Sequence, residues 1–462
     1  MQLVAYGAQD IYLTGNPQIT FFKVVYRRHT NFSMEAIEQT INGSSTLTAS
    51  STSGTVTISR NGDLVGRVYV TSSTPGITDG DELVNEVELE IGGQRIDKHY
   101  KEWNQIWAEL STPDSKAVAY KAMTGALSHG LNKTGTAGVN MVQLPLNFWF
   151  CRNPGLALPL IALQYHEVKL KFTWGTSTAV GTTATCKVIV DYIYLDTDER
   201  RRFAQQSHEY LIEQLQRQNE TGTTSMKLNF NHPVKELIWT SDQSYTDAKL
   251  VLNGHDRFQK QEEEYFQLRQ PMDHHTAVPG ANIPMVDRPQ MLSVPLPVGV
   301  ATLGGVNTYN NGVTDIDAGV VTLAANGGST PSVGDVVVIS VIDDETAAVS
   351  QTVVTNVTAV TSATSFTVDT SVGVDTNFSI HIIARSQSPL SRCSQMTDKI
   401  NVYSFALKPE EHQPSGTCNF SRIDNAKLNF TADPHSGTMN IYAVNYNVLR
   451  IMSGMGGLAY SN

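Results

Sequence analysis

Short β-strand patterns recur along nearly the whole chain, and they restrict its fold more than any other feature. The segments are rich in Val, Ile, Thr, Tyr and Phe, and clusters of Gly, Asn, Asp, Ser and Pro separate them. Their spacing is typical of antiparallel sandwiches and jelly rolls, not of alternating strands and helices. The sequence therefore predicts an all-β protein, with clear strands at residues 65–71, 87–91, 168–174, 188–195, 234–240 and 440–449.

Two short motifs occur twice in the same order, which predicts two similar halves. The run Lys169-Leu170-Lys171-Phe172-Thr173 returns 258 residues later as Lys427-Leu428-Asn429-Phe430-Thr431. The run Val190-Asp191-Tyr192 returns 254 residues later as Val444-Asn445-Tyr446. We expect each half to end in the same pair of strands, and residues 169–173 to be the structural equivalent of residues 427–431.

Helix patterns are few. Residues 101–110 place Trp103, Ile106, Trp107 and Leu110 at helical spacing and end before a Ser-Thr-Pro stop. A second helix is predicted over about residues 204–217, where Leu211, Ile212 and Leu215 share one face, and it serves as the linker between the halves (residues 206–218).

One segment, residues 299–384, differs in composition from the rest. It is dominated by Val, Thr, Ser, Gly, Ala and Asp. It contains no Lys, and a single Arg, Arg385, occurs only at its far edge. We interpret it as an inserted β module with strands at 336–342, 353–360 and 366–368, because it is too apolar for a disordered linker. A long flexible surface loop is the alternative.

The length limits the number of domains, and the net charge argues against nucleic acid as a partner. The 462 residues suffice for two to four domains, each with its own core. The net charge is −11, whereas a surface that neutralises phosphates needs clustered Lys and Arg. The densest basic cluster, residues 200–202, follows three acidic residues and is interpreted as a salt-bridged surface stretch. We therefore expect no direct contact with nucleic acid.

The cysteines and the N-terminus predict a soluble protein of a reducing compartment. No pair among the four cysteines has the C-x-x-C spacing of a zinc or redox site. The chain start lacks the features of a signal peptide. The longest apolar run, residues 156–163, contains Pro159 and falls far short of the roughly 20 residues that a membrane-spanning helix needs.

The usual catalytic motifs are absent from the sequence. There is no G-x-x-x-x-G-K-[ST] loop, H-E-x-x-H helix or G-x-S-x-G elbow. His274 and His275 are adjacent, and strand neighbours point to opposite faces, so they are not expected to bind one metal ion together. The acidic run 262–264 is interpreted as a solvated face, and the Gly-rich run 454–457 as part of a flexible tail (residues 451–462). We therefore predict no enzyme activity, no cofactor, and no catalytic, cofactor-binding or metal-binding residue.

The N-terminal run resembles the opening of the major capsid proteins of nucleocytoplasmic large DNA viruses. It reads Gly7-Ala8-Gln9-Asp10-Ile11-Tyr12-Leu13-Thr14-Gly15-Asn16-Pro17-Gln18-Ile19-Thr20-Phe21-Phe22-Lys23. Further blocks that resemble the same family lie at residues 145–167, 196–203, 232–237 and 403–424, and the last contains Lys408-Pro409-Glu410-Glu411-His412. Only the predicted module, residues 299–384, falls outside the resemblance.

The resemblance implies a double jelly roll, two fused antiparallel sandwiches, that acts as a structural protein of an icosahedral capsid. Three copies would form a homotrimeric capsomer with six jelly rolls around one axis, which tiles a hexagonal lattice and contacts neighbouring capsomers. The implied division is an N-terminal arm (1–30), a first jelly roll (31–205), a second (219–450) that carries the module, and the tail. The arm holds Lys23, Arg27, Arg28 and His29 and is expected to face minor capsid proteins or the internal membrane. The virion is the implied location, with assembly in the host cytoplasm and outer loops that could touch the host surface.

Two other functions fit a jelly-roll fold. A glycan-binding lectin would use aromatic platforms, for which Tyr245 and Tyr309 are the candidates. A metal-dependent jelly-roll enzyme would need an H-x-H pair, which the sequence lacks.

Overall fold

The computed structural model describes residues 29–125, 142–283 and 391–460, apart from positions 75, 78 and 222. Outside these ranges it describes residues 7–9, 12, 14, 16 and 22, and then 296–300, 320–322, 333–342, 349–362, 365–369 and 377–384. Most of the predicted arm, including Lys23, Arg27 and Arg28, lies outside the described residues, as does Tyr309.

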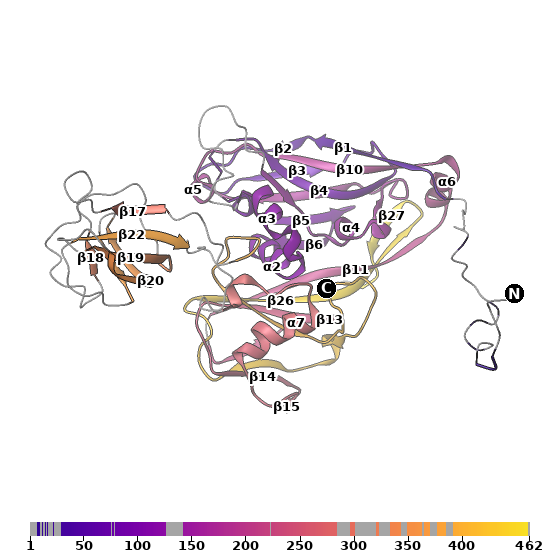
Figure 1. Cartoon of the computed structure of the whole chain (residues 1–462). Coiled ribbons are helices and arrows are strands. Elements are labelled where there is room, and N and C mark those ends of the chain that lie inside the picture. The colour runs from indigo at the N-terminus through magenta and orange to yellow at the C-terminus, as the bar shows by residue number, and fades with distance from the viewer. Residues whose placement is uncertain are drawn as a thin grey trace.

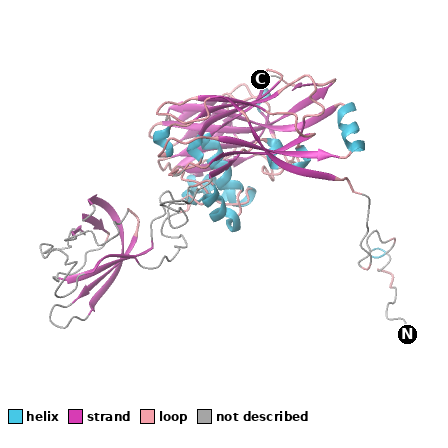
Figure 2. Cartoon of the chain, turned by 90° about the horizontal axis from the view of Figure 1, so that it is seen from above, coloured by secondary structure: helices cyan, strands magenta, loops and turns pink. Residues whose placement is uncertain are grey.

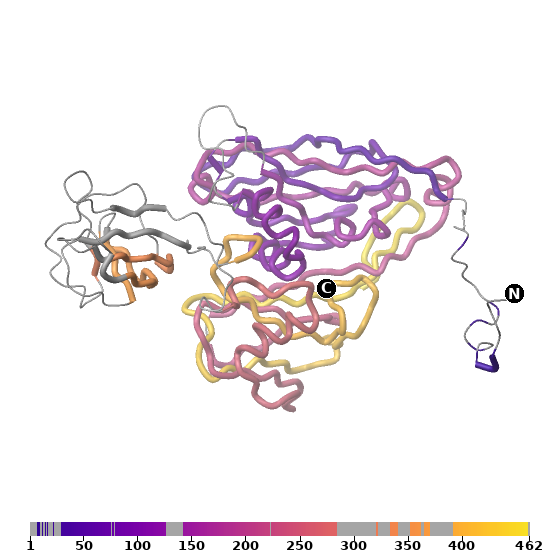
Figure 3. Tube along the Cα trace, viewed as in Figure 1, coloured from indigo at the N-terminus to yellow at the C-terminus, as the bar shows by residue number. Residues whose placement is uncertain are grey.

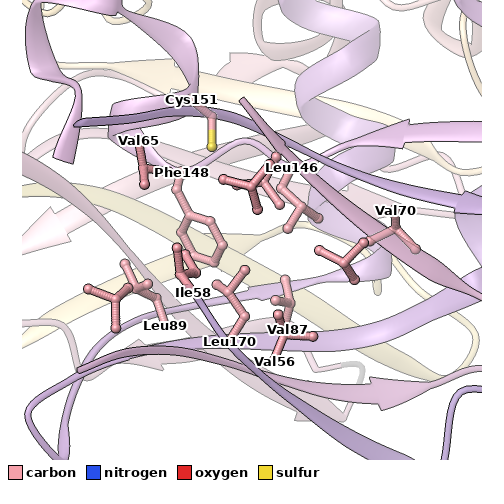
Figure 4. Close-up of a cluster of buried hydrophobic side chains, with 14 of the residues drawn as sticks. Val56, Ile58, Val65, Val70, Val87, Leu89, Leu146, Phe148, Cys151 and Leu170 are labelled. Atoms are coloured by element: carbon pink, nitrogen blue, oxygen red, sulfur yellow. The ribbon is translucent and has the colours of Figure 1, made fainter. Parts of the chain in front are cut away.

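The first half folds into two antiparallel sheets that face each other. Sheet A has the strand order β1-β10-β4-β7, with β8 beside β4, and sheet B has the order β2-β3-β9-β5-β6. Apolar side chains alternate along these strands and meet between the sheets in one continuous core (Figure 4). The strands are β1 (Phe32–Gln39), β2 (Ile41–Gly43), β3 (Ser53–Thr57), β4 (Leu64–Ser72), β5 (Val84–Ile91), β6 (Gln94–Tyr100), β7 (Val142–Pro145), β8 (Leu158–Pro159), β9 (Val168–Trp174) and β10 (Lys187–Leu195).

Short helices connect and cover these strands. The predicted helix over 101–110 is confirmed as α2, which directly follows β6 and ends where Thr112 and Pro113 turn extended. The helices of this half are α2 (Lys101–Ser111), α3 (Asp114–Met123), α4 (Trp149–Arg152), α5 (Ser177–Val180) and α6 (Thr197–Gln205), with single turns η1 (Asp81–Leu83) and η2 (Pro154–Leu156).

The second half repeats the same strand order. Sheet C is β11-β26-β13-β23, with β24 beside β13 and β27 beside β26, and sheet D is β12-β25-β14-β15, with β16 beside β14. A second apolar core lies between them. Its strands are β11 (His208–Thr221), β12 (Ser225–Leu228), β13 (Pro233–Ser241), β14 (Asp247–Leu252), β15 (His255–Asp256), β16 (Gln261–Glu262), β23 (Lys399–Ser404), β24 (Cys418–Asn419), β25 (Ala426–Phe430), β26 (Thr438–Met452) and β27 (Met455–Leu458). The π-helical turn η3 (Tyr265–Arg269) and α7 (Gln270–His274) follow β16, and short turns η4 (Gly280–Asn282) and η6 (Phe420–Arg422) complete this half.

The chain is thus a double jelly roll, as predicted, and the two repeated motifs have different outcomes within it. β9 and β25 occupy the same place in sheets B and D, and Leu170 and Leu428 both face their cores. β10 and β26 also correspond, but Val190 faces the first core whereas Val444 points away from the second. The second motif therefore identifies the matching strands and not the matching residues.

Two predicted segments are wrong. Residues 206–218 are not a linker helix, because β11 pairs with β26 over its full length, from His208–Ile451 to Thr221–Thr438. The helix in this region is α6, which ends at Gln205, before the predicted linker segment begins. Residues 451–462 are not a flexible tail throughout, since β27 pairs with β26 and Gly454 accepts a hydrogen bond from the Tyr165 amide of the first jelly roll. Figure 3 shows this C-terminal hairpin turning back beside the first jelly roll.

The predicted module contains a sheet of its own, with the order β17-β22-β19-β20-β21-β18. Figures 1 and 2 draw these strands beside the jelly rolls and not within either of them. The predicted strand 336–342 coincides with β19, and those at 353–360 and 366–368 lie within β20 and β21. The strands are β17 (Leu296–Val300), β18 (Val320–Thr322), β19 (Val336–Ile342), β20 (Val349–Ser362), β21 (Ser365–Val368) and β22 (Asn377–Ala384).

Candidate functional site

The surface on which the two jelly rolls meet, here called the seam, joins α2, β6 and α4 of the first to the outer face of sheet C. Its apolar part is a cluster in which α2 packs on strands β13, β23 and β26 (Figure 1). Burial of each large apolar side chain contributes about 1.5–3 kcal/mol. The cluster consists of Trp103, Ile106, Trp107 and Leu110 from α2, with Ile238, Met396, Ile400, Val402, Tyr442 and Val444 from the second half.

A chain of buried charges continues the seam beside this cluster. Lys235 of β13 is fully buried, and its Nζ donates to Glu213 Oε1 at 2.7 Å and to the Pro409 carbonyl at 2.6 Å. The other Glu213 oxygen lies 3.0 Å from Arg152 Nη1, and the guanidinium of Arg152 stacks 4.4 Å from the Trp107 ring. Burial lowers the pKa of Lys235, and the contact with Glu213 opposes that shift. The seam therefore holds paired charges whose loss would leave a buried ion without a partner.

Hydrogen bonds to β6 fix the position of β11 along the seam. Asp97 Oδ1 accepts from the Leu215 amide at 3.0 Å, and Gln214 donates to the Ile96 carbonyl. The second Asp97 oxygen lies 2.9 Å from His99 Nε2, and the His99 ring stacks on Phe148 at 4.4 Å. In the first turn of α2, Glu102 accepts from Asn440 and Tyr442, and burial raises the pKa of that carboxyl. Both ends of the seam are thus tied by specific polar contacts as well as by packing.

Glu109 of α2 connects the first jelly roll to the segments that flank the module. Its carboxylate accepts from the backbone amides of Gly280 at 3.2 Å, Arg392 at 2.9 Å and Ser394 at 2.9 Å. The Arg392 guanidinium donates to the Glu109 and Thr112 carbonyls. Gly280 precedes the module and residues 392–394 follow it, and these flanking segments are here called the stem of the module. One buried carboxylate, here called the Glu109 clamp, therefore holds both ends of the stem.

His275 lies between two carboxylates of the second jelly roll. Its Nε2 is 2.9 Å from Glu236 Oε2 on β13, and its Nδ1 is 2.9 Å from Glu410 Oε1. Burial alone would lower the pKa of His275, but the two carboxylates outweigh it and raise the pKa to about 9. The imidazolium in turn lowers the pKa of Glu410 against the effect of burial. This bridge attaches residues 405–417 to α7 and sheet C.

The structure places the remaining singled-out residues in structural roles. His274 does not join His275, since its Nδ1 meets the Leu407 carbonyl. Glu263 of the acidic run accepts from the Tyr245 amide, whereas Glu262 and Glu264 are exposed. Tyr245 is only 3% exposed, with its hydroxyl on Asn401, so it is wrong as a glycan platform. Among the described residues, no His, Cys, Asp or Glu groups are arranged to hold a metal ion.

The charged residues of the seam were not singled out from the sequence, whereas Trp103, Ile106, Trp107 and Leu110 of its apolar cluster were. One signal was available for Lys235 and Glu236, because they interrupt an apolar strand between Val234 and Leu237. Charges inside a buried strand require partners. In the described part of the chain, no helix has the length and apolarity to cross a bilayer.

Comparison with known proteins identifies the family. Residues 20–199 match the family described as major capsid protein N-terminus, and residues 199–246 and 385–457 match the large eukaryotic DNA virus major capsid protein family. The major capsid protein of Pyramimonas orientalis virus is 46% identical over 490 residues, covering 100% of this chain and 99% of that protein. The major capsid protein of Paramecium bursaria Chlorella virus 1 is 38% identical, with the same coverage.

A solved structure agrees with these matches in fold. The quasi-atomic model of the PBCV-1 virus capsid aligns with a TM-score of 0.63 and 31% identity, over 96% of this chain and 100% of that chain. The relatives are named as structural proteins of a capsid, so the chain is a structural component of a virion and not an enzyme. The chain belongs to the major capsid protein family of large eukaryotic DNA viruses.

Proposed function

We propose that three copies of this chain form a pseudo-hexagonal capsomer, and that such capsomers tile the icosahedral shell of a large double-stranded DNA virus. The observation that carries the proposal is the repeated strand order of sheets A and B in sheets C and D, with the two jelly rolls locked at one seam. Three chains then present six similar jelly rolls around a threefold axis. A fixed seam is required, because a hinge there would let the angle between neighbouring jelly rolls vary.

The seam has the character of a permanent junction. Its apolar cluster is buried, and Glu213 of the second half pairs with Arg152 of the first half as well as with Lys235 of its own half. Domain interfaces that move are smaller and more exposed to water. In the proposed capsomer the seam is a rigid part. No residue has a proposed catalytic, cofactor-binding or metal-binding role.

The remaining parts have proposed roles at the edges of the capsomer. The arm, residues 1–30, faces minor capsid proteins and the internal membrane at the capsomer base, since it combines the family-like run with four basic or titratable side chains. The module, residues 299–384, forms an outer decoration of the second jelly roll that is available to the host surface. Assembly is proposed to take place in the host cytoplasm, as the resemblance to the capsid proteins of nucleocytoplasmic large DNA viruses implies.

Light scattering on the purified full chain, followed by electron microscopy of assembled particles, tests the proposal. A stable trimer with six lobes is the expected result. A monomer that binds a glycan array would instead favour the lectin, although the burial of Tyr245 removes one of the two platforms which that function would use.

A further inference from the structure

The turn η1 places a buried carboxyl group, that of Asp81, close to the Glu109 clamp. Asp81 is 1% exposed, and among the described residues neither of its carboxyl oxygens has a hydrogen-bond partner. Burial raises the pKa of Asp81 well above its ordinary value; the charges of Asp79, Glu82 and Glu109 raise it further, and the Gln105 amide opposes them. A buried carboxylate without a donor is costly, because nothing replaces the water that it loses on folding. The site therefore requires either a counter-ion or a proton.

The cationic groups near η1 have other partners. The Nζ atom of Lys101 lies 2.7 Å from Oε1 of Glu82. The Nζ atom of Lys121 donates to a backbone carbonyl next to the stem at 2.9 Å. Two further neighbours, the Tyr120 hydroxyl and the Cys393 thiol, are neutral near pH 7 because burial raises the pKa of each. A proton is therefore the means by which the charge at this site is removed.

Glu109 differs from Asp81 in the hydrogen bonds that it accepts. Its carboxylate accepts from the backbone amides of residue 280 and residues 392–394, and the Ser394 hydroxyl adds a fifth bond. Hydrogen bonds to the charged form of an acid favour that form. Of these two buried carboxyl groups, the one with five donors therefore holds the negative charge, and the one with no donor holds the proton.

We propose that Asp81 carries a proton in the closed structure and is a pH-sensitive lock on the stem of the module. Loss of this proton places a second negative charge near the Glu109 carboxylate in a buried site, where like charges repel strongly. Water relieves this repulsion when residues 391–394 move away from α2. The stem is therefore closed in acid and opens more often as the pH rises. The lock acts within one chain and does not depend on the proposed trimer.

A polar groove brings solvent close to the lock. The groove has a volume of about 570 Å³, and Asp79 lines it together with Gln395 and Met396, which directly follow the clamped residues. Oδ1 of Asp79 accepts from the Asp81 amide at 2.9 Å. Burial raises the pKa of Asp79 to about 6. Asp79 therefore lies between Asp81 and the groove, and the two acids take up and release protons as a coupled pair.

The raised pKa values set the sign of the pH dependence. In an opened stem both aspartates titrate near their ordinary pKa of about 4. In the closed stem the pKa of Asp79 is about 6 and that of Asp81 is also raised. The closed state thus binds more protons than the opened state, so closure is most favourable below about pH 4 and weakens as the pH rises through 6. One linked proton changes the opening equilibrium by up to about tenfold per pH unit.

Hydrogen exchange of the full chain, measured by mass spectrometry and corrected for the direct effect of pH on amide exchange, tests the lock. In the wild type, peptides covering residues 391–396 should exchange up to about tenfold faster per pH unit between about pH 5 and 8. Asp81→Asn keeps the shape of the side chain without its charge and should remove most of this dependence. Asp198→Asn removes an exposed carboxylate of α6 and is the matched control, which should behave as the wild type does. Melting curves verify that each variant is folded.

Infrared spectroscopy gives a second readout, which a purely structural role of Asp81 would not change. The difference spectrum of the wild type minus Asp81→Asn at neutral pH should contain the C=O stretch of a protonated carboxylic acid, and the same difference for Asp198→Asn should lack it. A difference spectrum for Asp81→Asn without this band would overturn the lock. So would a wild-type exchange rate at residues 391–396 that does not change with pH, or an equal pH dependence in the wild type and Asp81→Asn.

Discussion

The two jelly rolls share a strand order but differ in what stabilises them. The first encloses one continuous apolar core, to which the C-terminal hairpin adds Leu449 and Ile451. The second encloses a smaller apolar core and places several charged groups in full burial, among them Lys235, Glu236 and His275. Apolar packing depends little on pH, whereas buried ion pairs depend on protonation and on every partner being present. The first half also buries charged groups, among them Asp81, Asp97 and Glu109, but its larger apolar core makes it depend less on them than the second jelly roll depends on its buried ion pairs.

The largest effect is expected from Lys235→Ala, which sharpens the comparison. It leaves Glu213 buried with only Arg152 as a charged partner and removes the donor to the Pro409 carbonyl. Loss of one partner of a buried pair costs about 3–5 kcal/mol. Chemical denaturation of the full chain measures the free energy of unfolding. Lys171→Ala on the exposed face of sheet B is the control and should cost under about 1 kcal/mol. Equal losses for the two variants would contradict the role given to burial.

The next effect is a pH dependence that belongs to the second jelly roll. The pKa of His275 is raised to about 9 by its carboxylates, so the stability it contributes is fully present below the unfolded pKa near 6.5 and is lost as pH rises through 9. We expect the wild type to lose up to about 3 kcal/mol over this window relative to His275→Gln. Paired denaturation curves at pH 6.5 and 9 give the comparison. Parallel curves for the two proteins would rule out an imidazolium at this site.

A smaller and local effect is expected from Glu109→Gln. The amide keeps an acceptor oxygen but removes the negative charge and adds donors that face the amides of Gly280 and Ser394. Hydrogen exchange measured by mass spectrometry should become about tenfold faster in peptides covering residues 391–394, which corresponds to about 1.4 kcal/mol. Peptides from β9 should exchange as in the wild type. Unchanged exchange at 391–394 would show that the Glu109 clamp does not hold the stem.

Replacement of residues 299–384 by a short Gly-Ser linker should have little effect on the unfolding of either jelly roll. The reason is that the strands of the module form a sheet separate from sheets A to D, and the Glu109 clamp holds residues that lie outside the replaced segment. Trimers should persist, and particles should have shorter surface protrusions in electron micrographs. Loss of folding would mean that the segment supplies strands to a jelly roll core.

Deletion of residues 1–28 is expected to have the smallest effect on stability and a specific effect on assembly. Strand β1 begins at Phe32, so every described strand of the two jelly rolls lies outside the deleted segment. The truncated chain should form a soluble trimer with an unchanged melting temperature that no longer assembles into particles. Aggregation of the truncated chain would place the arm in a jelly roll core instead.

The sequence determined the all-β class, the duplication and the helix at 101–110, because each depends on a local pattern. Alternation in 169–173 and 427–431 sets which side chains face the cores, and the spacing of Trp103, Ile106 and Leu110 sets the apolar face of α2. The resemblance in residues 7–23 identified the family, which the comparisons confirm.

Only the tertiary structure decided that the segment of β11 forms a strand and which residues the buried charges contact. Ile212 faces the first core and Leu215 contacts the apolar cluster of the seam, so this strand is apolar on both faces and its pattern imitates a helix. Its pairing with β26 overrides that local preference, because the bonds of a sheet come from residues more than 200 positions away. Likewise Glu109 and His275 find their partners across 135 to 285 positions, apart from the contact of His275 with Glu236. A charge pattern can show that a buried group needs a partner, but only the fold decides which distant residue supplies it.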